Sequence, residues 1–290
     1  MNSLYDLIIN AGPNHVFATT LAGIFGLLIG SFLNVVIYRV PQMMQRESDN
    51  YVASESGLPL PHTDDYNLMA PRSACPQCGH KITALENIPV ISYLALRGKC
   101  AACKTPISAR YPVVELLTAM LSAALIWHFG SGLAGLGTLV FLYLLIAMTF
   151  IDADTQLLPD DLTLPLMWCG LLINLQGTFV PLHEAVIGAA AGYMSLWLVN
   201  YLFELIRKKQ GMGHGDFKLL AALGAWLGWK MLPVIILMSS LVGAVVGIIL
   251  IVLAKRGVGV PIPFGPYLAV AGVVSLLYGQ SLAQALIGIS

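Results

Sequence analysis

The chain contains a series of apolar runs, most of them about as long as a membrane-spanning helix. A helix of about 20 residues crosses the hydrocarbon core of a bilayer. Only 10% of the 290 residues are charged and 57% are hydrophobic, whereas a soluble domain carries about 25% charged residues. We therefore expect an all-α polytopic membrane protein with about eight spans. These are residues 16–40, 111–129, 133–151, 162–175, 184–206, 219–229, 232–254 and 262–289.

The positions of lysine and arginine predict the orientation of these spans. They are Arg39, Arg46, Arg72, Lys81, Arg97, Lys99, Lys104, Arg110, Arg207, Lys208, Lys209, Lys218, Lys255 and Arg256. Eight spans with a periplasmic N-terminus place all of these on one side, the cytoplasmic side, and only Lys230 opposite. Residues 1–15 contain no Lys or Arg, so we expect the first run to be a retained anchor rather than a cleaved signal peptide. The formal net charge is zero, which argues against a general nucleic-acid-binding protein.

One polar stretch, residues 41–110, separates the first span (residues 1–40) from the predicted helical catalytic core (residues 111–290). A domain of this size often needs a metal or another crosslink. It contains two C-x-x-C pairs, Cys75 with Cys78 and Cys100 with Cys103. Four thiolates complete a closed tetrahedral shell, so we predict one structural zinc ion.

Disulfides or a redox dithiol are the alternatives to zinc. A reducing cytoplasm disfavours disulfides, and a redox site needs only one C-x-x-C pair. Two nearby histidines, His62 and His80, are possible spare ligands. We expect them to be solvated loop histidines instead, since four thiolates already satisfy the metal. Cys169 lies inside the fourth span and is expected to be a small core residue.

Two aspartates lie at span ends, where ionisable residues are costly and are therefore functional candidates. Asp152 ends the third span, and Asp216 opens the sixth after Gly213 and Gly215. Both lie at the predicted cytoplasmic boundary. Two carboxylates held within a few ångström share a proton, so one activates a water and the other protonates the leaving amine. Glycines without a Cβ let backbone approach Asp216 closely, and the pattern predicts aspartic-protease chemistry.

Simpler interpretations stand beside this one. Asp152 and Asp216 can be ordinary boundary carboxylates. Asp160 and Asp161 fit a cap for the fourth span, and Asp154 is either a partner of the pair or a solvated loop residue. His214, beside Asp216, either tunes the pair or is a plain loop histidine, and we favour the loop histidine. The GxGxG of residues 211–215 follows a membrane helix, not a strand, so we reject a dinucleotide loop.

Several segments resemble the bacterial type IV prepilin peptidases, which belong with the GxGD membrane aspartyl proteases. They are residues 30–36 (GSFLNVV) with 38–41 (YRVP), the two C-x-x-C pairs, Ile151-Asp152 with Leu158-Pro159-Asp160, and Gly213-His214-Gly215-Asp216. The resemblance runs from about residue 23 to residue 267. Because several motifs occur in the family's order, the resemblance is specific.

The resemblance implies a bifunctional leader peptidase and N-methyltransferase of type IV pilus and type II secretion systems, in the bacterial inner membrane. Asp152 and Asp216 match the catalytic aspartates, Gly213 and Gly215 support them, and the four cysteines match the zinc site. The implied substrates are prepilins and pseudopilins, cut at the cytoplasmic face after a short basic leader that ends in glycine. The new N-terminal residue, often phenylalanine, is then methylated with S-adenosylmethionine.

The resemblance does not identify the residues that bind the methyl donor. Residues 30–41 and the cytoplasmic domain are the candidate regions. Residues 261–266 (PIPFGP) open the last span, where they either help unwind substrate or simply start a helix.

Two other functions compete with this interpretation. A membrane prenyltransferase binds Mg²⁺ and pyrophosphate through aspartates at helix ends, but the second site offers only Asp216. A proton-coupled transporter uses aspartates as a relay, but such proteins place them near the bilayer midplane and show repeated halves. Metal-independent peptide cleavage excludes the prenyltransferase.

Overall fold

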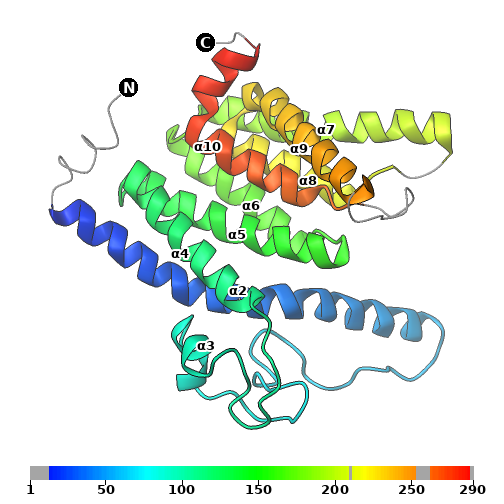
Figure 1. The fold of residues 1–290 in the computed structure, drawn as a ribbon. Helices are drawn as coiled ribbons and strands as arrows, with labels where there is room; N and C mark the ends of the chain where they lie inside the picture. The colour runs from blue at the N-terminus through cyan, green and yellow to red at the C-terminus, as the bar shows by residue number, and fades with distance from the viewer. Residues whose placement is uncertain (1–12, 209–210, 253–261, 288–290) are drawn as a thin grey trace. The chain divides into compact units, whose positions relative to one another are not determined.

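The computed structural model describes residues 13–208, 211–252 and 262–287 (Figure 1). Every regular element in these ranges is a helix, apart from two isolated β-bridges, which confirms the predicted all-α class. The chain forms two compact units, Met1–Tyr143 and Leu144–Ser290. Among the predicted features, Lys209, Lys255, Arg256 and Pro261 lie outside the described residues.

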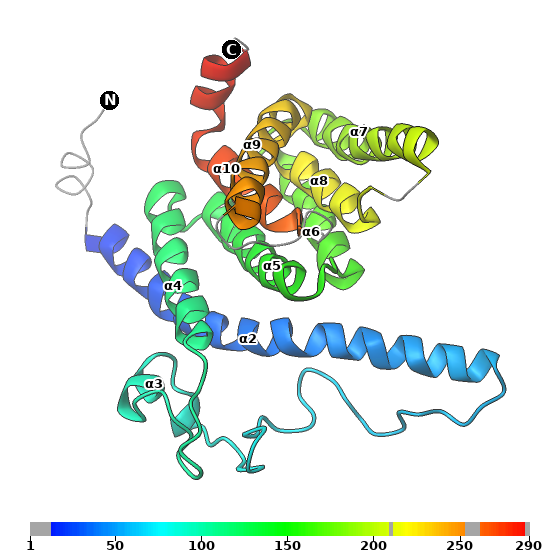
Figure 2. The ribbon, with the colours of Figure 1, turned by 45° about the vertical axis from the view of Figure 1, so that its right-hand side comes forward.

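The first unit is built on two long helices, α2 (Pro13–Glu55) and α4 (Arg110–Phe129). Both views show them packed together (Figures 1 and 2). A Cβ on Gly26 would lie 2.8 Å from the Cα of Ala119, and one on Gly30 would lie 2.7 Å from the Cα of Glu115. This G-x-x-x-G spacing therefore brings the two backbones into contact, as in many membrane helix pairs.

The first helix does not end at the polar stretch. It continues through Pro41 as one helix of 43 residues, although proline removes one intrahelical hydrogen bond. The residues after Pro41 include Gln, Met, Arg and Glu, which favour helix. The polar stretch thus begins with a helical extension of the first span.

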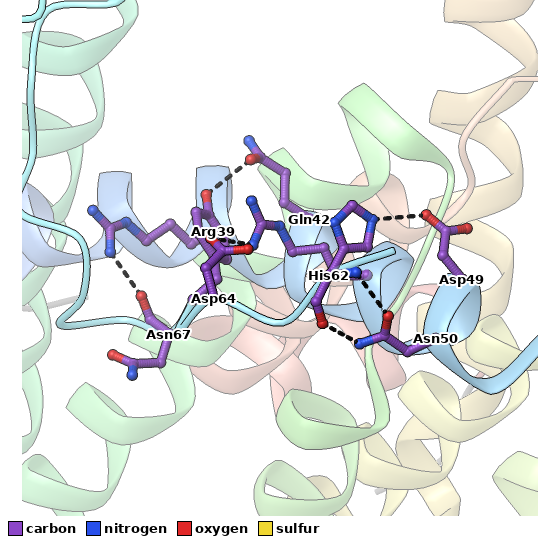
Figure 3. Close-up of polar contacts among 9 residues, drawn as sticks. Arg39, Gln42, Asp49, Asn50, His62, Asp64 and Asn67 are labelled. Atoms are coloured by element: carbon purple, nitrogen blue, oxygen red, sulfur yellow. Dashed lines mark hydrogen bonds and ion pairs between the residues drawn. The ribbon is translucent and has the colours of Figure 1, made fainter. Parts of the chain in front are cut away.

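The chain that returns from this extension is held along α2 by polar contacts (Figure 3). Arg39 donates hydrogen bonds to the backbone carbonyls of Asn67 and Pro71. Arg46 pairs with Asp64 at 2.9 Å, and this neighbour lowers the pKa of the Asp64 carboxyl group. The short elements η1 (Leu85–Asn87) and α3 (Ile91–Ala95) follow before α4.

The second unit contains the membrane helices that carry the candidate aspartates. Helix α5 (Leu133–Thr155) leads into it from the first unit, and α6 (Asp160–Ile173), η2 (Asn174–Gln176), α7 (Leu182–Arg207), α8 (His214–Leu227), η3 (Trp229–Met231), α9 (Leu232–Val252) and α10 (Gly265–Ile287) follow. Helix α8 packs against α6 and α7. Every residue from Asp216 to Leu227 is buried except the half-buried Lys218, so α8 is enclosed by protein.

Five helices among the described residues are long and apolar enough to cross a membrane. They are Asn14–Glu55, Arg110–Phe129, Leu133–Thr155, Leu182–Arg207 and Trp229–Leu250. Gly265–Gly279 is a shorter apolar helix, and α6 and α8 have 14 residues each. The protein is thus a polytopic membrane protein, and the number of eight spans stays a prediction.

Candidate active site and metal centre

Asp152 lies near the end of α5, where its side chain is buried. Its Oδ2 accepts a hydrogen bond of 2.9 Å from the backbone N–H of Gly265, the first residue of α10. The first N–H groups of a helix have no partner within the helix and carry the positive end of its dipole. The start of α10 therefore holds the side chain of Asp152 and stabilises a negative charge on it.

Gly265 leaves no room for a side chain at this contact. A Cβ there would lie 2.7 Å from the Asp152 Oδ2 and 3.3 Å from the Cδ1 of Leu158. Only glycine therefore brings the α10 backbone this close to the carboxylate. Gly265 lies within the PIPFGP stretch at residues 261–266, whose glycine the sequence analysis did not single out.

Asp216 lies in the first turn of α8, and Gly213 is the residue before that helix. The carboxyl group is buried, and its Oδ1 has no hydrogen-bond partner among the described residues. A Cβ on Gly215 would lie 2.6 Å from the Cβ of Leu158, so this glycine lets the start of α8 pack directly onto the loop after α5. A Cβ on Gly213 would meet only the Asp216 Oδ2, at 3.9 Å.

One residue, Leu158, lies between the segments that carry the two aspartates. Its side chain lies against Gly215, one residue before Asp216, and against Gly265, which contacts Asp152. The charge of Asp152 also acts on Asp216 through space. The structure thus brings together two carboxyl groups that are 64 positions apart in the chain.

Two further contacts fix the start of α8, and neither was predicted from the sequence. The side-chain oxygen of Asn200, on α7, accepts hydrogen bonds from the backbone N–H groups of Gly211 and Met212. Lys218, on α8, donates to both oxygens of Asp160, on α6, at 2.6 and 2.7 Å. A polar residue on a membrane helix is a signal that could have identified Asn200.

The predicted cap of α6 by Asp160 or Asp161 is wrong. Pro159 occupies the N-cap position, and both aspartates lie inside the first turn, where negative charge still favours the helix. Asp154 and Asp161 are exposed. The prediction of a loop histidine at position 214 is wrong, because His214 is the first residue of α8. It is exposed, and its ring lies 5.4 Å from the ring of Phe217.

The four predicted metal ligands form one cluster in the first unit. The Sγ atoms of Cys75, Cys78, Cys100 and Cys103 all lie within 4.8 Å of one another. Each C-x-x-C pair sits in a turn of the same design: the N–H of the residue four positions after the first cysteine donates to the carbonyl of that cysteine. Each turn is closed by one β-bridge.

The chemistry of the donor set fits a divalent cation. The hydroxyl and backbone N–H of Thr105 lower the pKa of Cys103 to about 6. A hydrogen bond with the backbone of His80 lowers the pKa of Cys78. The contacts of Cys78 with the other three thiols outweigh that effect and raise its pKa to about 11. Four clustered thiols therefore cannot all ionise by themselves, and a cation bound between them removes the repulsion.

Neither nearby histidine belongs to the metal cluster. His62 lies 3.3 Å from Asp49, and His80 lies 3.1 Å from Glu86. Both lie in loops, as expected, but they are half-buried and paired with carboxylates rather than simply solvated. Cys169 is half-buried in α6, outside the cluster.

Two family models match this chain. The bacterial peptidase A24 N-terminal domain matches residues 24–129, and the type IV leader peptidase family matches residues 139–248. No solved structure matches the chain.

Curated relatives cover nearly the whole chain. A protein of Aeromonas salmonicida is 56% identical over 91% of this chain and 92% of its own length. A protein of Pseudomonas aeruginosa is 53% identical over 93% and 94%, and one of Neisseria gonorrhoeae is 52% identical over 93% of each chain. All three are named prepilin leader peptidase/N-methyltransferase.

The fold and its two centres define a helical membrane enzyme of the peptidase class, with a buried pair of carboxyl groups and a four-cysteine domain. More specifically, the chain belongs to the type IV leader peptidase family.

Proposed function

We propose that this protein cleaves the leader peptides of type IV prepilins and pseudopilins and then methylates the new N-terminal amine. The observation that carries the peptidase half is the pair of buried carboxyl groups, Asp152 and Asp216, around Leu158. The names of the relatives support both activities. We assign Asp152 and Asp216 as the catalytic residues, with Gly213 and Gly215 in support.

The surroundings of the two aspartates suggest different roles. The N–H of Gly265 donates to Asp152, which favours the ionised form of that residue. The Oδ1 of Asp216 is buried without a partner among the described residues, and a second negative charge beside Asp152 is costly. We therefore assign the shared proton to Asp216 before cleavage.

Peptide hydrolysis follows from this arrangement. Asp152 takes a proton from a water molecule as the water oxygen attacks the scissile carbonyl carbon. Asp216 gives its proton to the leaving amine nitrogen as the C–N bond breaks. The products are a carboxylic acid and a free amine, and transfer of the proton from Asp152 to Asp216 restores the starting state.

The four-cysteine cluster is proposed to hold one zinc ion in a structural role. Four thiolates leave no open position for water or substrate, so the ion would join residues 75–78 to residues 100–103 rather than take part in hydrolysis. S-adenosylmethionine is the proposed methyl donor and supplies an electrophilic methyl group to the new amine.

The proposed location is the bacterial inner membrane, with the N-terminus in the periplasm and both centres on the cytoplasmic side. The lysine and arginine distribution supports this orientation. A client with a basic leader and a hydrophobic helix that stays in the bilayer must be cut where these two meet, at the cytoplasmic interface.

The purified protein in detergent, incubated with a prepilin peptide and read by mass spectrometry, tests both activities. We expect cleavage without added cofactor, and a further mass increase of one methyl group only when S-adenosylmethionine is added. An intact peptide under both conditions would reject the peptidase assignment. A cleaved but never methylated product would reject the methyltransferase assignment alone.

A further inference from the structure

The segment just before α4 exposes apolar side chains where a water-facing surface is expected to be polar. Leu85 is 77% exposed, Ile91 64% and Leu94 68%, and Ile88 is also exposed. Ile91 and Leu94 are three positions apart in α3, so they lie on the same face of that helix. Single exposed apolar residues are normal, but a contiguous set marks an interaction surface.

The opposite face of α3 packs into the four-cysteine domain. The hydroxyl of Tyr93 donates to the carbonyl of Ile107, and a Cβ on Gly98 would lie 2.9 Å from the Tyr93 ring. Tyr93 thus holds α3 in a fixed orientation, which leaves Ile91 and Leu94 pointing outward. The exposure of these apolar residues is therefore built into the fold of the domain.

A buried carboxylate ties α3 to the membrane helix α4. The backbone N–H of Val90, the N-cap residue of α3, donates a hydrogen bond of 2.7 Å to Glu115. Glu115 is buried and lies five residues after Arg110, where α4 begins. At 1.5 Å per residue this is roughly 7 Å along the helix, so α3 is attached within the first two turns of α4. Figure 2 shows α3 beside the start of α4.

The exposed surface of α4 continues this apolar region. Tyr111, Val113 and Leu116, in its first two turns, are each more than two-fifths exposed. Because α4 is long and apolar enough to cross a membrane, lipid is the expected solvent for these side chains. The apolar side chains of α3 lie at the same end of that helix.

The charge of the segment fits an anionic membrane surface. Residues 72–110 contain six lysines and arginines and a single acidic residue, Glu86, within a chain whose net charge is zero. Glu86 is paired with His80, whereas Lys81, Arg97, Lys99 and Lys104 are exposed. Basic residues near the end of a membrane helix attract anionic lipid headgroups.

We propose that η1 and α3 lie in the membrane interface, with Leu85, Ile88, Ile91 and Leu94 among the lipid acyl chains and the flanking basic residues among anionic headgroups. The occupant of this surface is the phospholipid bilayer. The four-cysteine domain is thereby fixed against the membrane at a second place besides the helices that enter it. This inference does not depend on the peptidase or methyltransferase activity.

Photolabelling of the full-length protein in vesicles tests the proposal. The vesicles contain phosphatidylcholine with a photoreactive group in its acyl chain, and labelled peptides are identified by mass spectrometry. We expect label in residues 85–96 at a yield about tenfold above that in residues 58–69. The second segment is a matched control, because Leu58 and Met69 are also exposed apolar residues of the first unit.

Two variants and one change of lipid complete the test. Replacing Ile91 and Leu94 together by glutamine should remove label from residues 85–96, whereas Met69→Gln should not change it. Zinc content and labelling of α7 report that the fold is retained. Replacing part of the phosphatidylcholine with phosphatidylglycerol should increase labelling of residues 85–96 at low salt, and high salt should reverse the increase.

Absence of label from residues 85–96, with α7 labelled normally, would overturn the proposal. Crosslinking of residues 85–96 to a photoreactive prepilin peptide but not to lipid would assign this surface to the substrate and would also overturn it. Equal labelling of residues 85–96 with and without phosphatidylglycerol would reject the proposal that the basic residues bind anionic headgroups.

Discussion

Replacing Gly265 by alanine is expected to lower the rate of peptide cleavage about 100-fold. The new Cβ would lie 2.7 Å from the Asp152 Oδ2, whereas ordinary contacts begin at 3.4 Å. The carboxyl group must therefore retreat by at least 0.7 Å, the difference between these two distances. The retreat strains or breaks the hydrogen bond from the Gly265 N–H and moves Asp152 away from the water that we propose it activates.

The size of the effect follows from this displacement. Misplacing a catalytic group by about 1 Å costs about 100-fold in rate, which corresponds to about 2.7 kcal/mol of activation free energy. Because the substrate is still bound by the rest of the protein, kcat should fall much more than KM changes.

The assay is steady-state cleavage of a prepilin peptide by purified protein, with Gly132→Ala as the matched control. A Cβ on Gly132 would meet nothing within 4 Å, so that variant should cleave at the normal rate. Thermal unfolding and zinc content of both variants report retained folding. Cleavage by Gly265→Ala within about threefold of the rate of the unchanged protein, a difference of about 0.6 kcal/mol in activation free energy, would contradict this prediction.

Three further predictions concern the supports of the two centres. Cys75→Ser should release the bound zinc, as measured by metal analysis of the purified protein, whereas Cys169→Ser should retain it; an unchanged metal content in the first variant would reject the four-thiolate site. Asn200→Ala leaves two backbone N–H groups before α8 without their acceptor. The variant should therefore be less stable by about 1–3 kcal/mol in thermal unfolding and should cleave more slowly. An unchanged melting temperature would contradict this prediction. Arg46 lowers the pKa of the Asp64 carboxyl group below its ordinary value of 3.8, so the Arg46–Asp64 ion pair is fully present above that pH and is lost as the pH falls through the lowered pKa. Hydrogen exchange of residues 58–69, corrected for the intrinsic rate, should therefore be the same at pH 7 and pH 5. A large increase in exchange over that range would show that another group controls the attachment of this segment.

The four-cysteine cluster could be predicted from the sequence more completely than the aspartate site. The spacing of Cys75, Cys78, Cys100 and Cys103 predicts four convergent thiols, because each pair occupies one tight turn. Nothing in the same spacing predicts that Glu115, in a membrane helix, accepts a hydrogen bond from the backbone of the domain. That contact depends on how the domain folds back onto α4.

Some residues of the aspartate site could also be predicted from the sequence, and others could not. Asp152 and Asp216 can be proposed as site residues from the sequence because charge at the end of an apolar run is costly. Gly265 was missed because it acts through its backbone N–H, which contacts Asp152. That contact exists only because the start of α10 packs against α5. Asp160 was expected to cap α6, but Pro159 occupies that position and Asp160 pairs with Lys218 on α8 instead. The roles of Gly265 and Asp160 depend on contacts between helices, which cannot be predicted from the residues next to them in the sequence.

The most direct test of the proposed dyad compares Asp152→Asn and Asp216→Asn on two substrates. One is a prepilin peptide with its leader, and the other is the same peptide already cleaved, offered with S-adenosylmethionine. If the two carboxyl groups act together in hydrolysis, each variant should lose detectable cleavage of the first peptide and still methylate the second. Normal cleavage by either variant, with correct membrane insertion, would contradict the assignment of that aspartate and the account built on the pair.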